Sequence, residues 1–251
     1  MKSGGKPAFR TPNVVTNANV GCIYVGNSIR RFGRRTCPRF LTMDTFDSYI
    51  LIGGRSSRLG ADKARVEIGG KTLLKRSIDA VREGLELSRI TAVAANEAQF
   101  AIEAIAADVP FIFDLYEGRG PLGGLHAVLA DAKTSWIFML ACDYPFVSSD
   151  LIALLREKVS DKFGCVVPEQ DDGRLQPLCA FYKVDAAKPI VDGIIERPRV
   201  PPPMHEIVSL LTPRVVAFDE YSHLAGADML FANINTPDDL AIARALDLPS
   251  P

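Results

Sequence analysis

Short apolar segments alternate with helical segments between Ser48 and Val159, and this alternation limits the folds open to the chain. The apolar segments have the length of β-strands and are Ser48–Ile52, Ile90–Ala95, Val109–Phe113 and Trp136–Ala141. The segments after them are read as helices over Thr72–Leu87, Ala98–Ala107, Leu122–Ala132 and from Ser148 or Ser149 to about Val159. Regular alternation predicts an α/β fold, a mostly parallel sheet with helices on both faces.

A glycine or a polar residue stands where each of these predicted strands stops. The four positions are Gly53, Asn96, Asp114 and Asp143. In open α/β sheets, ligands bind at the carboxyl ends of the parallel strands. We therefore expect these residues to meet at one edge of the sheet and to form a binding site there.

The loop after the first predicted strand has the composition of an anion-binding loop. Gly53 and Gly54 let the backbone turn sharply, so that consecutive N–H groups can face an anion. Arg55, Arg58 and Lys63 add positive charge, and arginine suits a bidentate grip on phosphate. The spacing matches neither the Walker loop nor the dinucleotide fingerprint. We interpret the loop as a phosphate site, the alternative being an ordinary turn with a solvated basic face.

Four motifs resemble those of a known family. From Leu51 to Lys63, Leu-Ile-Gly-Gly-Arg-Ser-Ser-Arg-Leu-Gly-Ala-Asp-Lys is similar to Leu-x-Gly-Gly-x-Ser-x-Arg-Met-Gly-x-Asp-Lys of the molybdenum cofactor guanylyltransferases, which have a Rossmann-like nucleotidyltransferase domain. The other matches are Gly120-Pro-Leu-Gly-Gly124, Cys142-Asp-Tyr-Pro145 and Asn233-Ile-Asn-Thr-Pro237. The resemblance runs from about Ile50 to Leu246.

The resemblance implies a set of site residues. Those expected to contact the nucleotide are Leu51, Ile52, Gly53, Gly54, Lys63, Asn96, Asp114, Gly120 and Asp143. A carboxylate such as Asp114 can accept hydrogen bonds from the N1–H and exocyclic amine of guanine, whereas cytosine has no such pair of donors. Asp143 is expected to hold Mg²⁺, which typically takes one or two protein carboxylates together with phosphate and water oxygens. A turn aspartate before Pro145 is the plainer alternative.

The implied reaction transfers GMP from GTP to the phosphate of molybdenum-molybdopterin, giving the guanine dinucleotide cofactor and pyrophosphate. Arg58, Lys63 and Asp143 are the expected catalytic residues, because a phosphate nucleophile is already anionic and catalysis then depends on positioning and charge neutralisation. For the segment Gly120–Gly124, glycines at a helix start let backbone N–H groups face a ligand, and a plain helix entry is the less favoured alternative. Asn233–Pro237 could lie near the second substrate or serve only as a strand end and helix cap.

Other functions were weighed against this one. A molybdopterin cytidylyltransferase would usually have Ala-Ala-Gly where this chain has Ile52-Gly-Gly54. A sugar-phosphate nucleotidyltransferase would have Gly-Gly-x-Gly-Thr-Arg-Leu. A non-catalytic nucleotide-binding subunit is disfavoured by the intact Lys63, Asp114 and Asp143. We expect a cytoplasmic monomer that binds small molecules, with no nucleic acid or membrane partner and only transient contacts with molybdenum-insertion proteins and apo-molybdoenzymes.

Residues 1–42 differ from the rest of the chain. They carry eight Lys or Arg and no Asp or Glu, so the remaining residues sum to −9. A transit peptide, a nucleic-acid-binding arm and translation from Met43 are three interpretations of this segment. We favour a disordered extension or a mis-called start, with the nucleotidyltransferase domain spanning 43–251.

The second half of the chain is less regular. A hairpin-like excursion is predicted from Gly164–Pro168 and Pro177–Tyr182, which flank a polar turn, followed by a helix over Asp185–Glu196 in which Pro189 disturbs the first turn. Further predictions are an extended Arg197–Pro203, a helix over His205–Leu211, strands over Arg214–Phe218 and Phe231–Ile234, and a final helix to about Leu246.

Composition also bears on membrane spans, on the redox state of the cysteines and on metal ligands. No apolar run has the length of a membrane span. The five cysteines are scattered without a Cys-x-x-Cys pair, which is typical of reduced thiols in a cytoplasm. His126, His205 and His223 make no metal-ligand pattern, and we expect them to be structural.

Overall fold

The structure is a computed structural model that describes residues 22–25, 28–31, 45–52, 66–86, 88–95, 109–116, 118–197 and 200–245. The chain divides into two units, Met1–Asp44 and Thr45–Pro251. Within the first unit, β1 (Cys22–Val25) and β2 (Ser28–Arg31) pair as an antiparallel ribbon. The sequence pattern predicted no strand there. That residues 1–42 are an extension to the domain stays a prediction.

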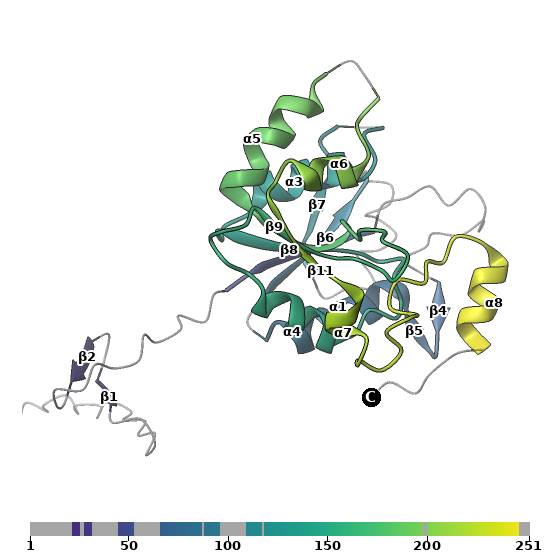
Figure 1. The fold of residues 1–251 in the computed structure, drawn as a ribbon, viewed down its shortest axis with the longest axis horizontal. Coiled ribbons are helices and arrows are strands. Elements are labelled where there is room, and N and C mark those ends of the chain that lie inside the picture. Colours follow the sequence, from purple (N-terminus) through teal and green to yellow (C-terminus); the bar gives the residue numbers. More distant parts are fainter. Residues whose placement is uncertain are drawn as a thin grey trace, which may run out of the picture. The chain divides into compact units, whose positions relative to one another are not determined.

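The second unit is built on a sheet whose described strands number seven (Figure 1). They are β3 (Asp47–Leu51), β6 (Arg89–Ala94), β7 (Phe111–Phe113), β8 (Trp136–Ala141), β9 (Cys165–Pro168), β10 (Cys179–Lys183) and β11 (Pro213–Val216), in the order β11-β9-β10-β8-β3-β6-β7. The central strand β3 pairs in parallel with β6 and β8, and β6 with β7. Only β10 runs antiparallel to its neighbours among these strands, so the predicted mostly parallel α/β sheet is confirmed.

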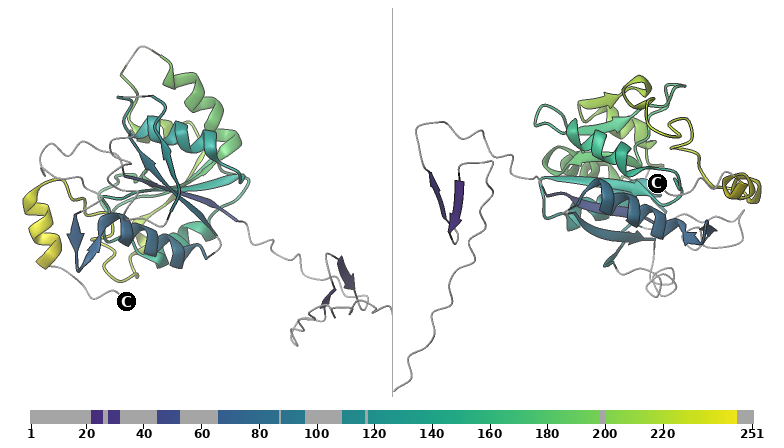
Figure 2. Two further views of the ribbon diagram at one scale, coloured as in Figure 1. Left: turned by 180° about the vertical axis from the view of Figure 1, so that it is seen from behind. Right: turned by 90° about the horizontal axis from the view of Figure 1, so that it is seen from below.

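Helices cover both faces of the sheet (Figures 1 and 2). On one face lie α1 (Leu73–Gly84) and α4 (Ser149–Glu157), and on the other lie α3 (Pro121–Asp131), α5 (Val184–Ile195) and α6 (Met204–Ser209). Successive side chains of a strand point to opposite faces. Ile50 and Ile52 therefore pack in the cluster under α1 and α4, whereas Tyr49 and Leu51 pack under α3 and α5.

The helix boundaries follow the capping residues. The hydroxyl of Thr72 accepts a hydrogen bond from Lys75 N at 3.1 Å and begins α1, and Ser148 begins α4 in the same way. Helix α1 ends at Gly84, three residues before the predicted Leu87. A Cβ at Gly84 would lie 2.9 Å from Cβ of Ile152 on α4. Glycine at this position therefore lets α1 and α4 approach closely. Pro189 is accommodated inside α5. The helix predicted at Ala98–Ala107 lies outside the described residues.

Two predictions for the second half differ from the structure. The predicted hairpin is confirmed, since β9 and β10 pair antiparallel, but it is part of the main sheet and not an excursion from it, because β10 also pairs antiparallel with β8 from Lys183↔Trp136 to Cys179↔Leu140. The strand predicted at Phe231–Ile234 is wrong. Phe231 is buried with its ring against Tyr144 and Tyr221 in a segment of turns, so its apolar character reflects packing rather than strand pairing.

Smaller elements complete this unit. A hairpin of β4 (Glu67–Ile68) and β5 (Lys71–Thr72) turns at Gly69 and Gly70, both at positive φ, as the paired glycines predicted. The short helix α7 (Phe218–Tyr221) follows β11. Helix α8 (Pro237–Ala245) packs against β4 through a small cluster that includes Ile68, Ile234 and Ala243.

A partly buried polar network holds the sheet at the amino ends of its parallel strands. Arg89 donates from Nε to Asp47 Oδ1 at 2.9 Å and from Nη2 to Asp131 Oδ2 at 2.8 Å. The hydroxyl of Tyr49 also donates to Asp131 Oδ2, at 2.8 Å. The second oxygen of Asp47 accepts backbone N–H groups of Lys133 and Thr134. The network ties β3 and β6 to the turn between α3 and β8.

Within the ranges described, no helix is long and apolar enough to cross a membrane.

Candidate active site at the carboxyl edge of the sheet

The carboxyl end of β3 lies where the winding of the sheet reverses. The chain proceeds from β3 to β6 and β7 on one side and then returns to β8 on the other side of β3. Beyond the strand end, Ile52 N donates to Val93 O at 3.0 Å, and Cys142 N donates to Leu51 O at 3.0 Å. Ligands of open α/β sheets bind at such switch points. In the sequence, Gly53–Lys63 follow this strand end directly.

Asp114 and the glycine-rich entry to α3 meet at this edge. Asp114 follows β7, and a Cβ placed on Gly123 would lie 2.4 Å from its Oδ2 and 2.5 Å from its Oδ1. A Cβ on Gly124 would lie 3.0 Å from Leu51 Cδ2. The carboxylate of Asp114 therefore rests directly on the first turn of α3, and the end of β3 packs beside it. This close approach explains the adjacent glycines of Gly120-Pro-Leu-Gly-Gly124 by packing.

The carboxyl group of Asp114 is partly buried, and nearby contacts offset part of the effect of burial on its pKa. Its N–H donates to Ala94 O at 2.9 Å, and its Oδ1 accepts from Tyr116 N at 2.8 Å. Burial raises the pKa of Asp114 above the usual aspartate value, while the Tyr116 hydrogen bond and the charge of His126 act in the opposite direction. Each carboxylate oxygen can accept two hydrogen bonds, so the group retains capacity for donors of a ligand.

Gly120 sets the direction in which the chain enters α3. It is the N-cap residue at φ 55° and ψ −142°, and its carbonyl accepts from Gly123 N at 3.0 Å. Residues with a Cβ rarely adopt this conformation, so glycine is needed here for the backbone. Pro121 follows at the first helical position, where its missing N–H is no loss.

Asp143 lies in the turn after β8, and several segments hold that turn in place. Its carbonyl accepts from Ile234 N at 3.3 Å, and the Pro145 carbonyl accepts from Arg76 Nε at 3.1 Å. The buried Tyr144 donates its hydroxyl to Gln176 Oε1 at 3.0 Å. The turn is therefore connected to α1, to the loop between β9 and β10, and to the Asn233–Pro237 segment.

The Asn233–Pro237 segment serves as a helix cap, one of the two roles that its sequence allowed, and its place near the second substrate stays a prediction. Asp239 Oδ2 accepts from Asn235 N at 2.9 Å and from Thr236 N at 2.8 Å, and Thr236 Oγ1 accepts from Asp239 N at 3.1 Å. This reciprocal arrangement caps α8. The hydrogen bond from Ile234 to Asp143 also brings the segment to the turn after β8.

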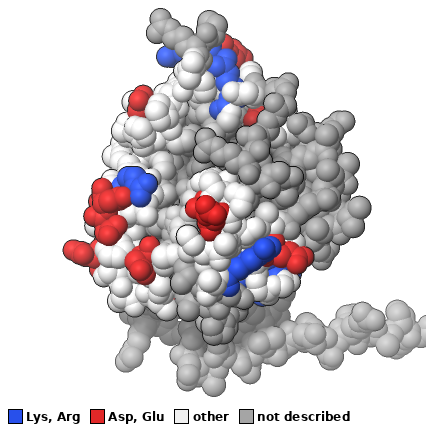
Figure 3. All heavy atoms as spheres, turned by 90° about the vertical axis from the view of Figure 1, so that its right-hand side faces the viewer, with Lys and Arg blue, Asp and Glu red and all other residues white. Residues whose placement is uncertain are grey.

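The structure brings part of the predicted site together. Leu51, Asp114, Gly120 and Asp143 lie along the carboxyl edge of the sheet. Figure 3 views the domain from the right-hand side of Figure 1, and acidic side chains lie near the middle of the described surface there. The side chain of Ile52 is buried under α1 and α4, so only its backbone is left to face a ligand. The predicted residues Gly53, Gly54, Arg58, Lys63 and Asn96 lie outside the described residues.

Sequence reasoning missed two contacts of the site. The motif Gly120–Gly124 indicates a helix start whose N–H groups can face a ligand, and the structure adds that Gly123 packs against the Asp114 carboxylate. The Tyr144–Gln176 hydrogen bond joins residues distant in sequence. The two adjacent glycines were the available signal for close packing. No local pattern could have indicated the second contact, because its partners lie in separate elements.

The described part of the chain contains no group of three or more His, Cys, Asp or Glu side chains able to hold a metal ion. A resident zinc-type centre is therefore not formed by these residues. A single carboxylate at Asp143, whose Oδ1 is buried, fits a magnesium ion that takes most of its oxygen ligands from phosphates and water.

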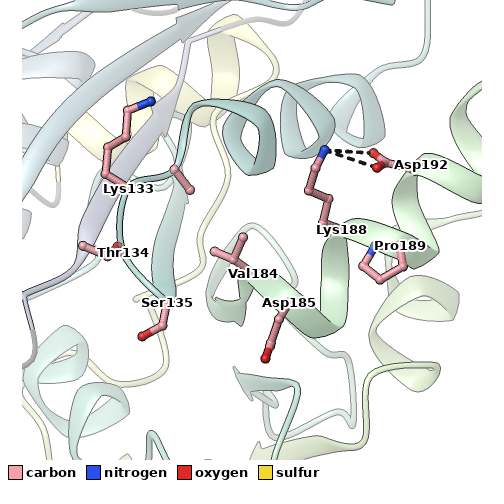
Figure 4. Close-up of a pocket in the computed structure, with 9 residues that line it drawn as sticks. Lys133, Thr134, Ser135, Val184, Asp185, Lys188, Pro189 and Asp192 are labelled. Atoms are coloured by element: carbon pink, nitrogen blue, oxygen red, sulfur yellow. Dashed lines mark hydrogen bonds and ion pairs between the residues drawn. The ribbon is translucent and has the colours of Figure 1, made fainter.

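An open pocket elsewhere in the domain is remote from these motifs. Its lining includes Thr134, Ser135, Val184 and Lys188, where β8 begins and β10 ends (Figure 4). This is the amino edge of the parallel strands, opposite to Leu51 and Asp143. The side chain of Lys188 there is paired with Asp192. The motif residues, rather than this pocket, define the candidate site.

Comparison with known proteins agrees with the motifs. The family model described as MobA-like NTP transferase domain matches residues 48–193, more than half of the chain. The chain belongs to the MobA-like NTP transferase family. A relative from Pelotomaculum thermopropionicum, named "Probable molybdenum cofactor guanylyltransferase", is 30% identical and aligns with 78% of this chain and 91% of its own length. A relative of the same name from Methanocaldococcus jannaschii is 28% identical over 76% of this chain and 94% of its own length.

Solved structures confirm the nucleotidyltransferase fold of this MobA-like chain. Molybdopterin-guanine dinucleotide biosynthesis protein A from Archaeoglobus fulgidus matches with a TM-score of 0.66 and 26% identity, over 80% of this chain and 98% of its own. The 4-diphosphocytidyl-2C-methyl-D-erythritol synthase from Anaerococcus prevotii matches with a TM-score of 0.58 and 14% identity, over 81% and 98%. The second likeness concerns the fold alone.

Proposed function

We propose that this MobA-like nucleotidyltransferase transfers GMP from GTP to the terminal phosphate of molybdenum-loaded molybdopterin. The observation that carries the proposal is that Asp114 lies on Gly123 and Leu51 on Gly124 at the carboxyl edge, while Asp143 follows β8, the strand next to β3. Relatives named as molybdenum cofactor guanylyltransferases match most of the chain, which supports the same reaction.

Asp114 is proposed to recognise the guanine base. Its carboxylate is held by Tyr116 N and by the surface of Gly123, so its orientation is set before a nucleotide arrives. Guanine presents an N1–H and an exocyclic amine side by side, and a carboxylate accepts both. A cytosine ring has no equivalent pair, so the same geometry favours GTP over CTP. Asn96, which follows β6 in the sequence, is proposed to line the same pocket.

The phosphates are proposed to bind between the loop after β3 and the turn after β8. The backbone of Gly53 and Gly54 would cradle phosphate, and Arg58 and Lys63 would neutralise the triphosphate and the departing pyrophosphate. Asp143 would hold Mg²⁺, which supplies charge stabilisation on phosphate oxygens when bound. The buried Tyr144 and the Arg76 contact to Pro145 keep that aspartate at the edge of the sheet.

In the proposed reaction, a terminal phosphate oxygen of the pterin forms a bond to the α-phosphorus of GTP. The bond between the α-phosphorus and its bridging oxygen breaks, and pyrophosphate leaves with that electron pair. Because the nucleophile is already anionic, no side chain has to remove a proton. The described residues then act by orienting the base and fixing the carboxylate of Asp143. We further propose a cytoplasmic monomer that meets its insertion partners transiently.

The deciding experiment is product analysis after incubation with molybdenum-loaded molybdopterin, Mg²⁺ and GTP, CTP or UTP in turn. We expect a guanine dinucleotide and pyrophosphate with GTP only. Asp143→Asn should lower turnover by at least about 100-fold, a size typical of lost transition-state charge stabilisation. The matched control Asp161→Asn changes an aspartate that is 91% exposed and paired with Lys183, and it should leave turnover unchanged. Transfer with CTP alone, or none from any nucleotide, would refute the proposal.

A further inference from the structure

His126 lies between the residue proposed to read guanine and a neighbouring helix. It is on α3, one turn after Gly123, with a side chain only 12% exposed. Its ring meets that of Tyr116 edge to face, with centroids 4.9 Å apart and planes at 89°. Its Nε2 lies 3.4 Å from Asp192 Oδ1 on α5. Its Nδ1 is buried without a hydrogen-bond partner among the described residues.

The two residues that His126 contacts, Asp192 and Tyr116, make further contacts on α5 and at its end. Asp192 is also paired with Lys188 at 3.2 Å on the outside of α5. Tyr116 donates its hydroxyl to Glu196 Oε1 at 3.3 Å, just beyond the end of α5. Helices α3 and α5 lie side by side on the same face of the sheet in Figures 1 and 2. The loop that carries Asp114 is therefore attached to α5 through Tyr116 directly and through His126.

We propose that His126 is a positioning residue for guanine recognition, holding the Asp114–Tyr116 loop against α5 through Asp192. The inference rests on the proposed function, because it takes Asp114 as the group that binds the base. Two physical effects support it. The ring packing on Tyr116 fixes the residue whose N–H orients the Asp114 carboxylate, at 2.8 Å. The charge of His126 also lowers the pKa of Asp114 against the effect of burial, which favours the ionised form that guanine requires.

The groups that surround this histidine are the ones to vary. His126→Phe keeps a ring against Tyr116 but removes the contact to Asp192 and the charge. Asp192→Ala removes the anchor from α5 and leaves His126 in place. Lys188→Ala is the matched control, because Lys188 contacts the same aspartate, at 3.2 Å to Oδ2 and 3.4 Å to Oδ1, but lies on the same helix as Asp192 and so does not link α5 to α3.

The readout is the ratio of dissociation constants for GTP and ITP, measured by equilibrium binding with Mg²⁺, beside the thermal midpoint of each protein. ITP lacks the exocyclic amine of guanine, so the ratio reports how well the carboxylate engages that amine. We expect His126→Phe and Asp192→Ala to reduce the preference for GTP by about tenfold, a size typical of one misplaced hydrogen bond to a charged acceptor. The control should keep the ratio of the wild type.

Other outcomes separate the inference from the proposed function. Two results would overturn the positioning role. One is an unchanged ratio of GTP to ITP dissociation constants in both His126→Phe and Asp192→Ala. The other is an equal loss of GTP and ITP affinity together with a lower thermal midpoint. Asp114→Asn is run in parallel. If Asp114→Asn also leaves the ratio unchanged, the assignment of guanine to Asp114 fails. If Asp114→Asn removes the preference and the other two variants do not, only the inference about His126 is wrong.

Discussion

Replacing Gly123 by alanine should damage nucleotide binding far more than it damages the fold. The added Cβ would lie 2.4 Å from Asp114 Oδ2, whereas ordinary contacts begin near 3.4 Å. The carboxylate must therefore move by about 1 Å, since the helix backbone beneath Gly123 is fixed by the turn at Gly120. That displacement is comparable with the difference between a good hydrogen bond and none.

The size of the effect follows from the bonds at stake. A hydrogen bond to a charged acceptor contributes about 1.5–3 kcal/mol, so we expect GTP affinity to fall by roughly 10–100-fold. The effect on folding is smaller, because alanine is favoured over glycine inside a helix by about 1 kcal/mol while overpacking costs about 1–3 kcal/mol. Isothermal titration with GTP and thermal unfolding measure the two quantities separately.

Gly193 provides the control for this substitution. It lies inside α5, and a Cβ added there meets nothing within 4 Å. Gly193→Ala should stabilise the protein by about 0.5–1 kcal/mol and leave GTP affinity unchanged. The reasoning is refuted if Gly123→Ala binds GTP within about twofold of the wild type.

Three further predictions concern stability and reactivity. Asp47→Asn should lower the unfolding free energy by about 2 kcal/mol in denaturant titrations at pH 7, because it weakens the buried contact to Arg89. Burial raises the pKa of Asp47, but Arg89 and backbone N–H groups outweigh burial, so the pKa is lowered overall. The wild type should therefore lose this stabilisation as the pH falls from the usual aspartate range through the lowered pKa. Asp47→Asn should lack this pH dependence. Burial raises the pKa of Cys165 to about 12, so iodoacetamide at pH 8 should label it only after unfolding, as peptide mass mapping would reveal. Asp239→Ala should destabilise the protein by about 1 kcal/mol in thermal unfolding through the lost cap of α8, whereas equal stability would show that the capping hydrogen bonds add nothing.

Much of the fold is determined locally and could be predicted from the sequence. Apolar runs of strand length, capping residues such as Thr72 and Ser148, and the paired glycines of the β4–β5 turn each act within a few residues. The same local patterns placed Asp114 and Asp143 after strands, and parallel strands bring such positions to one edge. The membership of the family likewise followed from residues that are contiguous in the chain.

Apolar character alone does not distinguish a strand from other buried segments. Phe231–Ile234 was predicted as a strand, but Phe231 fills a space between Tyr144 and Tyr221 instead of joining the sheet. The hairpin of β9 and β10 could be predicted from the turn between them, whereas the pairing of β10 with β8 could not, since it depends on contacts over a long sequence distance.

The sequence by itself determined most elements of the α/β domain, the family and the residue types at the edge of the sheet. Only the tertiary structure decided that Asp114 rests on Gly123, that His126 connects the Asp114 loop to Asp192, and that Tyr144 supports the turn of Asp143 through Gln176. These relations join side chains from separate elements at distances of a few ångströms. Such proximity depends on how the helices pack on the sheet, and no spacing along the chain encodes it directly.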